Sequence, residues 1–250
     1  MKFSAAIIKE LKYYVYIYSH PITSEIFYVG KGKGNRVFSH LEEQTESQKV
    51  QYLKELKSQG LKPKIEILIH GLGDEKVALR VESSVIDLIG IKKLTNKQSG
   101  YESATFGRMT IDQVNALYNK QRIDIEDPVI LIRINQAFRY SMPENELYEY
   151  TRGRWKLNPK RAKNAKYGLA VYEGVVQEVY VILEWHKAGT TNSIRLEKEN
   201  IGLNTVESLD GRFEFIGNIA AKAIRDRYRF MSVEHYFRKG NSNPIMYINT

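Results

Sequence analysis

Apolar and polar positions in the first part of the chain follow strand and helix periods in turn. Two β-type runs, 13–18 (YYVYIY) and 26–29 (IFYV), flank a polar segment with Pro21, which predicts a hairpin. Three glycines within 30–34 are expected to break the second strand. Residues 64–69 alternate apolar and polar side chains, a pattern that predicts a third strand.

Helical patterns occupy the intervals. Helices are predicted from Asn35 to Leu41, over 47–59, and from Asp74, whose side chain can cap the first turn, to a stop at Gly90. The last of these has apolar residues at helical spacing, namely Val77, Val81, Val85, Leu88 and Ile89. The order β-β-α-α-β-α predicts a small α/β domain with a three-stranded sheet flanked by helices.

The pattern changes after Asp127-Pro128, beyond a polar stretch at 95–107 and a helix predicted near 110–121. Strands are predicted at Val129–Arg133, Tyr167–Tyr172, Val175–Leu183 and Arg212–Ile216, and short helices at 143–150 and 218–227. Glu173-Gly174 indicates a hairpin turn. We therefore expect an α+β protein with two domains, 1–124 and 125–250, the second a β-rich barrel.

Composition narrows the class of protein. Hydrophobic residues make up 42% and charged residues 27% of the chain, as in soluble globular proteins. No apolar run approaches the roughly 18 residues that span a bilayer, and residues 1–12 lack a secretory core. With no cysteine, disulfides and thiolate metal sites are excluded. We expect a cytoplasmic, intracellular protein with no membrane partner.

The net charge of +9 favours a polyanionic partner, because cations that neutralise phosphates release condensed counterions. Seventeen tyrosines suit strands, phosphate contacts and base stacking alike. Charge alone does not decide between nucleic acid and a mildly basic protein without such a partner.

Several residues with chemical potential follow one another in the first domain. Tyr16 and Tyr28 lie on the two hairpin strands, so their phenols can share one face. The segment from Gly30 to Arg36 combines glycines, which let a backbone approach phosphate, with two lysines and an arginine. Glu82 lies within an apolar helix and needs either exposure or a partner, of which a hard cation is one.

Each feature also has a plain structural interpretation. A glycine- and lysine-rich turn is often only solvated, the tyrosines are ordinary strand residues, and His40, four residues from Arg36, could be structural. Their order is what carries information. Tyr14-Val15-Tyr16, followed after eleven residues by Tyr28-Val29-Gly30, resembles the paired motif that names the GIY-YIG nucleases.

The resemblance covers about residues 12–100. Phe27–His40 (FYVGKGKGNRVFSH), Glu82–Ser84 and Leu94–Asn96 are especially similar to the branch found in eukaryotic LEM-domain nucleases. Tyr14 departs from the pattern, since it stands at the motif's first glycine, a position outside the chemistry.

This resemblance implies phosphodiester hydrolysis with one divalent metal, Mg²⁺ or Mn²⁺, bound directly by Glu82 alone. Arg36 would hold the scissile phosphate and Tyr16 would be the general base. A free tyrosine has a pKa near 10, so Tyr16 would need help to lose its proton. The resemblance implies supporting roles for further residues: Tyr28 and His40 to orient water or phosphate, with His40 a competing base; Lys31 and Lys33 to contact phosphate; Asn96 to hold the framework.

The second domain contains a basic segment, Thr151–Lys166, with seven basic residues, no acidic one, and Trp155 inside it. Such interleaving suits nucleic acid, and a solvated loop with an anchoring tryptophan is the alternative. The candidate contacts are Trp155, Arg152, Arg154, Lys156, Lys160 and Arg161. The strand pattern weakly resembles PUA-like (EVE/ASCH-type) barrels.

The leading hypothesis is a DNA endonuclease whose second domain selects substrate, with modified DNA as one candidate and restriction of foreign DNA as its setting. A structure-specific nuclease for branched or damaged DNA is the first alternative. A binding protein that only grips nucleic acid is the second, and the intact Tyr16, Arg36 and Glu82 set argues against it. The oligomeric state stays open.

Overall fold

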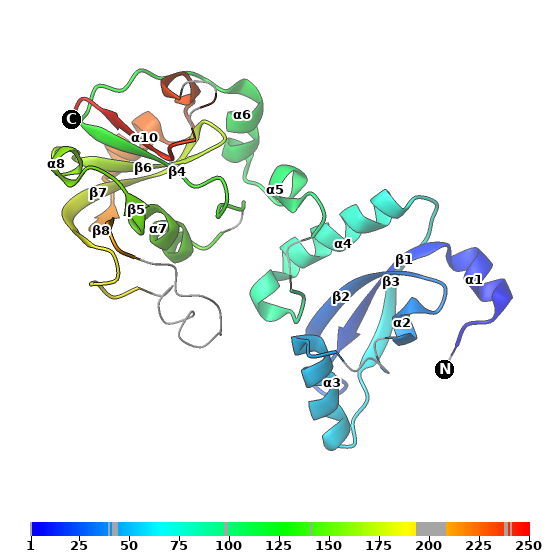
Figure 1. Ribbon diagram of the computed structural model, residues 1–250. Coiled ribbons are helices and arrows are strands. Elements are labelled where there is room, and N and C mark those ends of the chain that lie inside the picture. Colours follow the sequence, from blue (N-terminus) through cyan, green and yellow to red (C-terminus); the bar gives the residue numbers. More distant parts are fainter. Residues whose placement is uncertain are drawn as a thin grey trace. The chain divides into compact units, whose positions relative to one another are not determined.

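In the computed structural model the chain forms two compact units, Met1–Arg108 and Met109–Thr250. The structure describes residues 2–39, 41, 45–97, 100–140, 142–193, 209–237, 240 and 242–250. Each unit has its own sheet and its own buried clusters (Figure 1). No helix within these described ranges has the length and apolar character needed to cross a membrane.

The first unit is built on a three-stranded antiparallel sheet of order β2-β1-β3. Its strands are β1 (Tyr13–Ser19), β2 (Ile26–Lys33) and β3 (Lys64–Leu72). Its helical elements are α1 (Ala5–Leu11), α2 (Arg36–Ser39), α3 (Gln48–Ser58), α4 (Glu75–Ile89), η1 (Ile91–Lys93) and α5 (Ser103–Phe106). The predicted order of strands and principal helices is confirmed, while α1 was not predicted.

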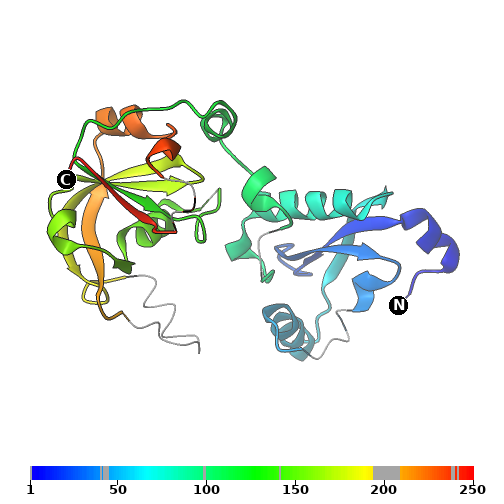
Figure 2. The same ribbon diagram turned by 45° about the horizontal axis from the view of Figure 1, so that its top comes forward.

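Helices cover both faces of this sheet. Helix α4 lies on one face, and α2 and α3 lie on the other (Figures 1 and 2). Because successive side chains of a strand point to opposite faces, Val15 and Ile17 pack beneath α4. Tyr14, Tyr16 and Tyr18 enter the cluster on the α2 and α3 face. Burial on both faces explains why 13–18 lacks the polar positions of a half-exposed strand.

The second unit contains a six-stranded sheet of order β5-β8-β7-β6-β4-β9. Its strands are β4 (Val129–Arg133), β5 (Trp155–Lys156), β6 (Tyr167–Tyr172), β7 (Val175–Lys187), β8 (Arg212–Ile219) and β9 (Ile245–Ile248). Its helical elements are α6 (Ile111–Asn119), α7 (Glu144–Arg152), α8 (Pro159–Ala162), α10 (Lys222–Tyr228) and η2 (Glu234–Tyr236).

This sheet curls into a nearly closed barrel. Its two outer strands approach each other where Tyr247 of β9 accepts a hydrogen bond from the Asn158 amide, 2.8 Å away and just beyond β5. Ile130 and Ile132 of β4 pack into one cluster and Val129 and Leu131 into another, so both faces are apolar. The expected α+β class with a β-rich second part is confirmed.

The observed bounds of some helices and strands differ from the predicted ones where the sequence pattern was ambiguous. Strand β8 runs on to Ile219, so the helix expected at 218–227 begins at Lys222. The hairpin turn at Glu173-Gly174 is present, with both residues at positive φ.

The first unit ends at Arg108, whereas the sequence placed the boundary at 124. Helix α6 begins with a capping box at Thr110, and its buried Ala116 lines a pocket with Phe230 and Met231. Because the composition of this helix is polar, the sequence did not indicate that it packs against the second unit.

Candidate active site

Glu82 lies at the outer edge of the first sheet. It projects from α4, and its Oε1 accepts a hydrogen bond of 2.7 Å from the Lys31 amide of edge strand β2. Burial raises the pKa of Glu82, against the Lys31 hydrogen bond and the charges of Lys31 and Arg36, which lower it. The apolar neighbours of Glu82 predicted that its carboxylate would need a partner if it were not exposed. The carboxylate is half-buried and has such a partner.

Asp87, the other acidic residue after Glu82 on α4, has a different environment. Its carboxylate accepts hydrogen bonds from the Ser103 hydroxyl at 2.8 Å and from the Arg108 amide at 3.3 Å. It therefore fixes the segment that follows α4 and lies away from the Lys31 edge.

Glu82 is the residue that would hold a magnesium ion at this site. Across the described residues, no group of three or more His, Cys, Asp or Glu side chains gathers as a closed metal cage would require. Magnesium takes one or two carboxylates and keeps waters and substrate phosphate as its other ligands. A carboxylate has about four acceptor positions, so Glu82 can bind a cation and keep its bond to Lys31.

Tyr16 and Tyr28 meet on the opposite face of the sheet. Their ring centroids are 6.1 Å apart, which places the two phenol side chains next to each other. Tyr16 is fully buried, and burial raises its pKa far above the ordinary range, with Tyr28 and Tyr18 adding to the rise and Arg36 opposing it. Tyr28 is only half-buried, so it is the member of this pair that reaches solvent.

The glycines of the motif do not form the phosphate-approaching loop that their spacing suggested. Gly30 and Gly32 are paired residues within β2, opposite Tyr16 and Tyr14. A Cβ at Gly30 would stand 2.8 Å from the Tyr16 hydroxyl, and one at Gly32 would overlap the Tyr14 ring. The glycines instead make room for tyrosine rings, and only Gly34, with φ +59°, ends the strand.

Two further tyrosines hold the connection that presents Arg36. Tyr14 donates a hydrogen bond of 2.9 Å to the Gly34 carbonyl and accepts one of 3.1 Å from the Val37 amide. Tyr18 donates to the Val37 carbonyl. The start of α2 is therefore attached to β1 through side chains, which fixes the base of the exposed Arg36 side chain.

Arg36 lies within electrostatic reach of this arrangement. Burial raises the pKa values of Tyr14, Tyr16 and Glu82, and the positive charge of Arg36 opposes the rise in each case. The structure thus brings together Tyr16, Tyr28, Arg36 and Glu82. His40 lies outside the described residues.

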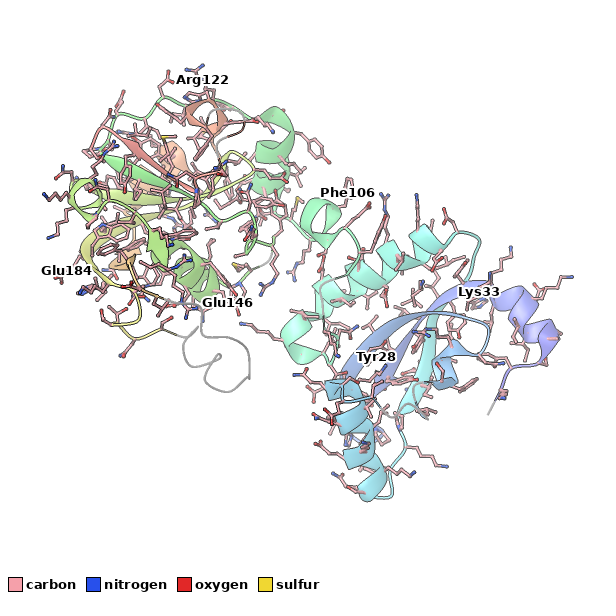
Figure 3. All side chains as sticks on the ribbon, in the orientation of Figure 1. Tyr28, Lys33, Phe106, Arg122, Glu146 and Glu184 are labelled. Carbon is pink, nitrogen blue, oxygen red and sulfur yellow. The ribbon has the colours of Figure 1, made fainter. Side chains whose placement is uncertain are left out.

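The lysines of the motif already have partners. Lys31 forms an ion pair with Glu75, and Lys33, at the end of β2, lies over the Tyr13 ring with Nζ 4.7 Å from its centre (Figure 3). Asn96 pairs with the outer edge of β2, donating to the Val29 carbonyl at 2.7 Å and accepting from its amide at 3.1 Å. These contacts extend the sheet edge that carries Lys31.

Lys49 is a cation at this site that sequence analysis missed. It lies in the first turn of α3, is only 8% exposed, and its Nζ lies 4.9 Å from the centre of the Tyr28 ring. A buried lysine over an aromatic face places positive charge beside the tyrosine pair. Its position two residues after the cap Ser47, in a polar helix, gave no signal to distinguish it from a surface lysine.

The basic segment of the second unit divides into inner and outer residues. Arg152 is 2% exposed; its Nε donates to the Phe215 carbonyl at 2.9 Å, and it pairs with Glu149. Arg154 is buried as well, so neither arginine is on the open surface that the sequence pattern suggested. The guanidinium of Arg152 is used inside the barrel, and we correct its proposed phosphate role accordingly.

The other members of that segment are more accessible. Lys156, Lys160 and Arg161 are exposed. Trp155 is half-buried against the barrel cluster, and its Nε1 donates to the Thr151 carbonyl at 2.8 Å. Trp155 is therefore both a packing residue and a partly open ring.

Comparison with known protein families gives one match. Residues 16–118 match the family described as "LEM-3-like GIY-YIG domain". The region that holds Tyr16, Arg36 and Glu82 is thus a GIY-YIG domain, the domain after which the GIY-YIG nucleases are named. Within that class it is of the LEM-3-like type. No curated protein and no solved structure matches the chain.

Proposed function

We propose that this protein is a metal-dependent DNA endonuclease whose first unit hydrolyses phosphodiester bonds at the β2 edge. The observation that carries the proposal is the half-buried Glu82 carboxylate held at the β2 edge by the Lys31 amide, with the Tyr16 and Tyr28 pair on the other face of the same sheet. A domain that only held DNA would gain little from half-burying Glu82 and raising its pKa.

The proposed roles follow from charge and accessibility. Glu82 would hold a magnesium or manganese ion, which would supply Lewis-acid chemistry for phosphodiester hydrolysis. Arg36, exposed at the start of α2, binds the scissile phosphate and offsets the charge that develops on it. The Tyr14 and Tyr18 hydrogen bonds keep the backbone around Val37 in place while Arg36 does so.

Tyr16 is the proposed general base, and Tyr28 holds the attacking water next to it. Because burial raises the pKa of Tyr16, its phenol is protonated at neutral pH before substrate binds. Arg36 favours the ionised form of Tyr16, and Lys49 places a further positive charge over the Tyr28 ring. Tyr28, which is half-buried and lies next to Tyr16, would pass the proton toward solvent.

The second unit is proposed to select the DNA. The nearly closed barrel and the exposed Lys156, Lys160 and Arg161 support a PUA-like recognition role. Modified DNA, as in restriction of foreign DNA, is the first substrate class to test.

Plasmid nicking in Mg²⁺ tests the nuclease directly. We expect wild-type protein to nick plasmid in Mg²⁺ and not in EDTA, Glu82→Gln to abolish cleavage with DNA binding retained, and Arg36→Ala to lower the rate by about 10²-fold or more. Unmodified, hydroxymethylated, glucosylated and branched substrates, compared in parallel, assign the substrate class.

Glu10→Gln is the matched control, since Glu10 is an exposed carboxylate on α1, and its activity should equal that of wild type. Mg²⁺-dependent cleavage at the wild-type rate by Glu82→Gln would place the metal site elsewhere. No cleavage of any substrate by folded wild-type protein that still binds DNA would favour a binding protein.

A further inference from the structure

A pocket of about 710 Å³ opens in the second unit. It lies at the end of β4, between the α7–β5 connection, the start of β8 and the residues before β9. The lining residues that the structure describes all belong to this unit. Its volume falls within the roughly 300–1,000 Å³ typical of sites for small ligands.

The lining of this pocket is strongly positive. Arg133, Arg154 and Arg212 line it, and no acidic residue appears among the described lining residues. One carboxylate stands behind the wall: a Cβ on Gly153 would lie 3.6 Å from Oε2 of the buried Glu214, whose Oε1 accepts from Thr191. Three arginines in the lining favour an anionic ligand.

The arginines are held in place by the backbone around the pocket. Arg133 donates to the Asn243 carbonyl at 2.5 Å, and Arg212 donates to the Arg154 carbonyl at 2.8 Å. Arg154 has φ +70°, a conformation that costs a non-glycine residue energy and that is over-represented at binding sites.

Two aromatic side chains also line the pocket, Tyr150 and Trp155. The Trp155 N–H is already bonded to Thr151, so what this residue can offer a ligand is its ring. Aromatic faces beside several arginines suit a ligand that carries both a planar ring and a phosphate. An inorganic anion alone would make no use of the rings.

We propose that this pocket binds a nucleoside phosphate, with the arginines on the phosphate and Tyr150 or Trp155 against the base. Binding of the nucleotide unit is independent of cleavage. The nucleotide could belong to a DNA strand or be free in solution. The assignment to a DNA strand rests on the proposed function. The two sources share one chemistry and are separated below.

Binding is measured on the full chain in EDTA, so that cleavage plays no part. The probes are inorganic phosphate, a deoxynucleoside 5′-monophosphate and a short labelled single-stranded DNA. Arg133→Gln should weaken binding of the monophosphate by about tenfold or more, because bonds to charged groups are the strong ones. Arg122→Gln makes the same change at an exposed arginine that pairs with Asp124 outside the pocket (Figure 3), and should change affinity by less than about twofold.

The ring contribution is tested by Trp155→Leu, which should weaken nucleotide binding and leave phosphate binding unchanged. Since Trp155 packs against the barrel cluster, Tyr150→Leu repeats the test with a second ring, and thermal melting reports the fold of each variant. Displacement of the labelled strand by monophosphate identifies a strand as the source. Monophosphate binding without strand binding overturns that source and keeps the pocket.

Two results would overturn the pocket itself. One is the absence of binding of both nucleotide and strand by folded wild-type protein, and the other is an equal loss in Arg133→Gln and Arg122→Gln. Neither depends on whether the plasmid is cut, so a failed pocket and a failed nuclease give different results.

Discussion

Tyr16 is the residue whose environment most constrains the chemistry. A fully buried phenol with a raised pKa carries almost no phenolate at neutral pH. Below that pKa the ionised fraction grows about tenfold per pH unit, so a reaction that uses Tyr16 as base must accelerate with pH.

We therefore expect the single-turnover cleavage rate at saturating DNA to rise with pH from about 6 to about 9 without a plateau. Tyr16→Phe should lose both the activity and the slope, and Tyr118→Phe, at an exposed tyrosine of α6, should keep both. A rate that levels off near neutral pH would instead assign the base to a group of lower pKa, such as His40.

The pH dependence of folding stability that Glu82 should produce is opposite to that of a salt-bridged carboxylate. Its pKa is raised in the folded state, so the folded form binds its proton more tightly than the unfolded form does. Stability from this group is present at low pH and lost as pH rises through the raised pKa. Without metal, the ionised carboxylate thus destabilises the first unit at neutral pH.

Glu82→Gln removes that charge and keeps an acceptor for the Lys31 amide. In EDTA we expect its melting temperature to exceed that of wild type at about pH 8, with the difference shrinking toward about pH 5. Added Mg²⁺ should stabilise wild type and leave Glu82→Gln unchanged. A mutant less stable than wild type at every pH would show that the carboxylate is held by partners stronger than its burial.

At the scale of elements, the connection between β2 and α2 determines where Arg36 stands. Tyr14→Phe keeps the ring above Gly32 and removes the hydrogen bonds to Gly34 and Val37. We expect a loss of about 1–3 kcal/mol in stability and a fall in kcat of about tenfold, with DNA affinity little changed. Tyr118→Phe is again the control, and a loss of stability with an unchanged kcat would limit Tyr14 to a structural role.

The elements also show where sequence patterns suffice. Strands with clear alternation or unbroken apolar runs, such as β1 and β6, were predicted within one or two residues, as was the capped helix α4. Strand β2 was cut short because Gly30 and Gly32 look like breakers, and only the register against Tyr14 and Tyr16 reveals why they are there.

The candidate site was predictable to a similar extent. Tyr16, Tyr28, Arg36 and Glu82 could be selected from their order in the chain. The structure places the rings of Tyr16 and Tyr28 next to each other and Glu82 against the Lys31 amide, and the catalytic roles of the four residues stay predictions. Arg152 was misplaced because a count of basic residues cannot distinguish a guanidinium bonded to Phe215 inside a barrel from one in solvent. Lys49 was missed because its sequence context looks like that of a surface lysine. Its burial arises from packing beside Tyr28, which the sequence does not reveal.

At the scale of the whole molecule, two units with separate cores should unfold separately. Calorimetry of the full chain should show two transitions, and Mg²⁺ should shift only the one that belongs to the first unit. The family match ends at residue 118, within α6, yet α6 packs with the second unit. The fragment 109–250 should therefore melt at a higher temperature than 120–250, and equal melting temperatures would return α6 to the nuclease domain.

The pairing of Tyr14 with Gly32 has a consequence for how this domain can change over evolution. A ring on β1 occupies the volume that a side chain on β2 would need, so neither position can change freely by itself. A relative with glycine at the position of Tyr14 has room for a larger residue at the position of Gly32, and a relative that keeps the tyrosine does not. Among relatives the two positions should covary as a compensating pair, whereas Tyr16 and Gly30 should stay fixed together wherever the Tyr16 phenol is needed for catalysis.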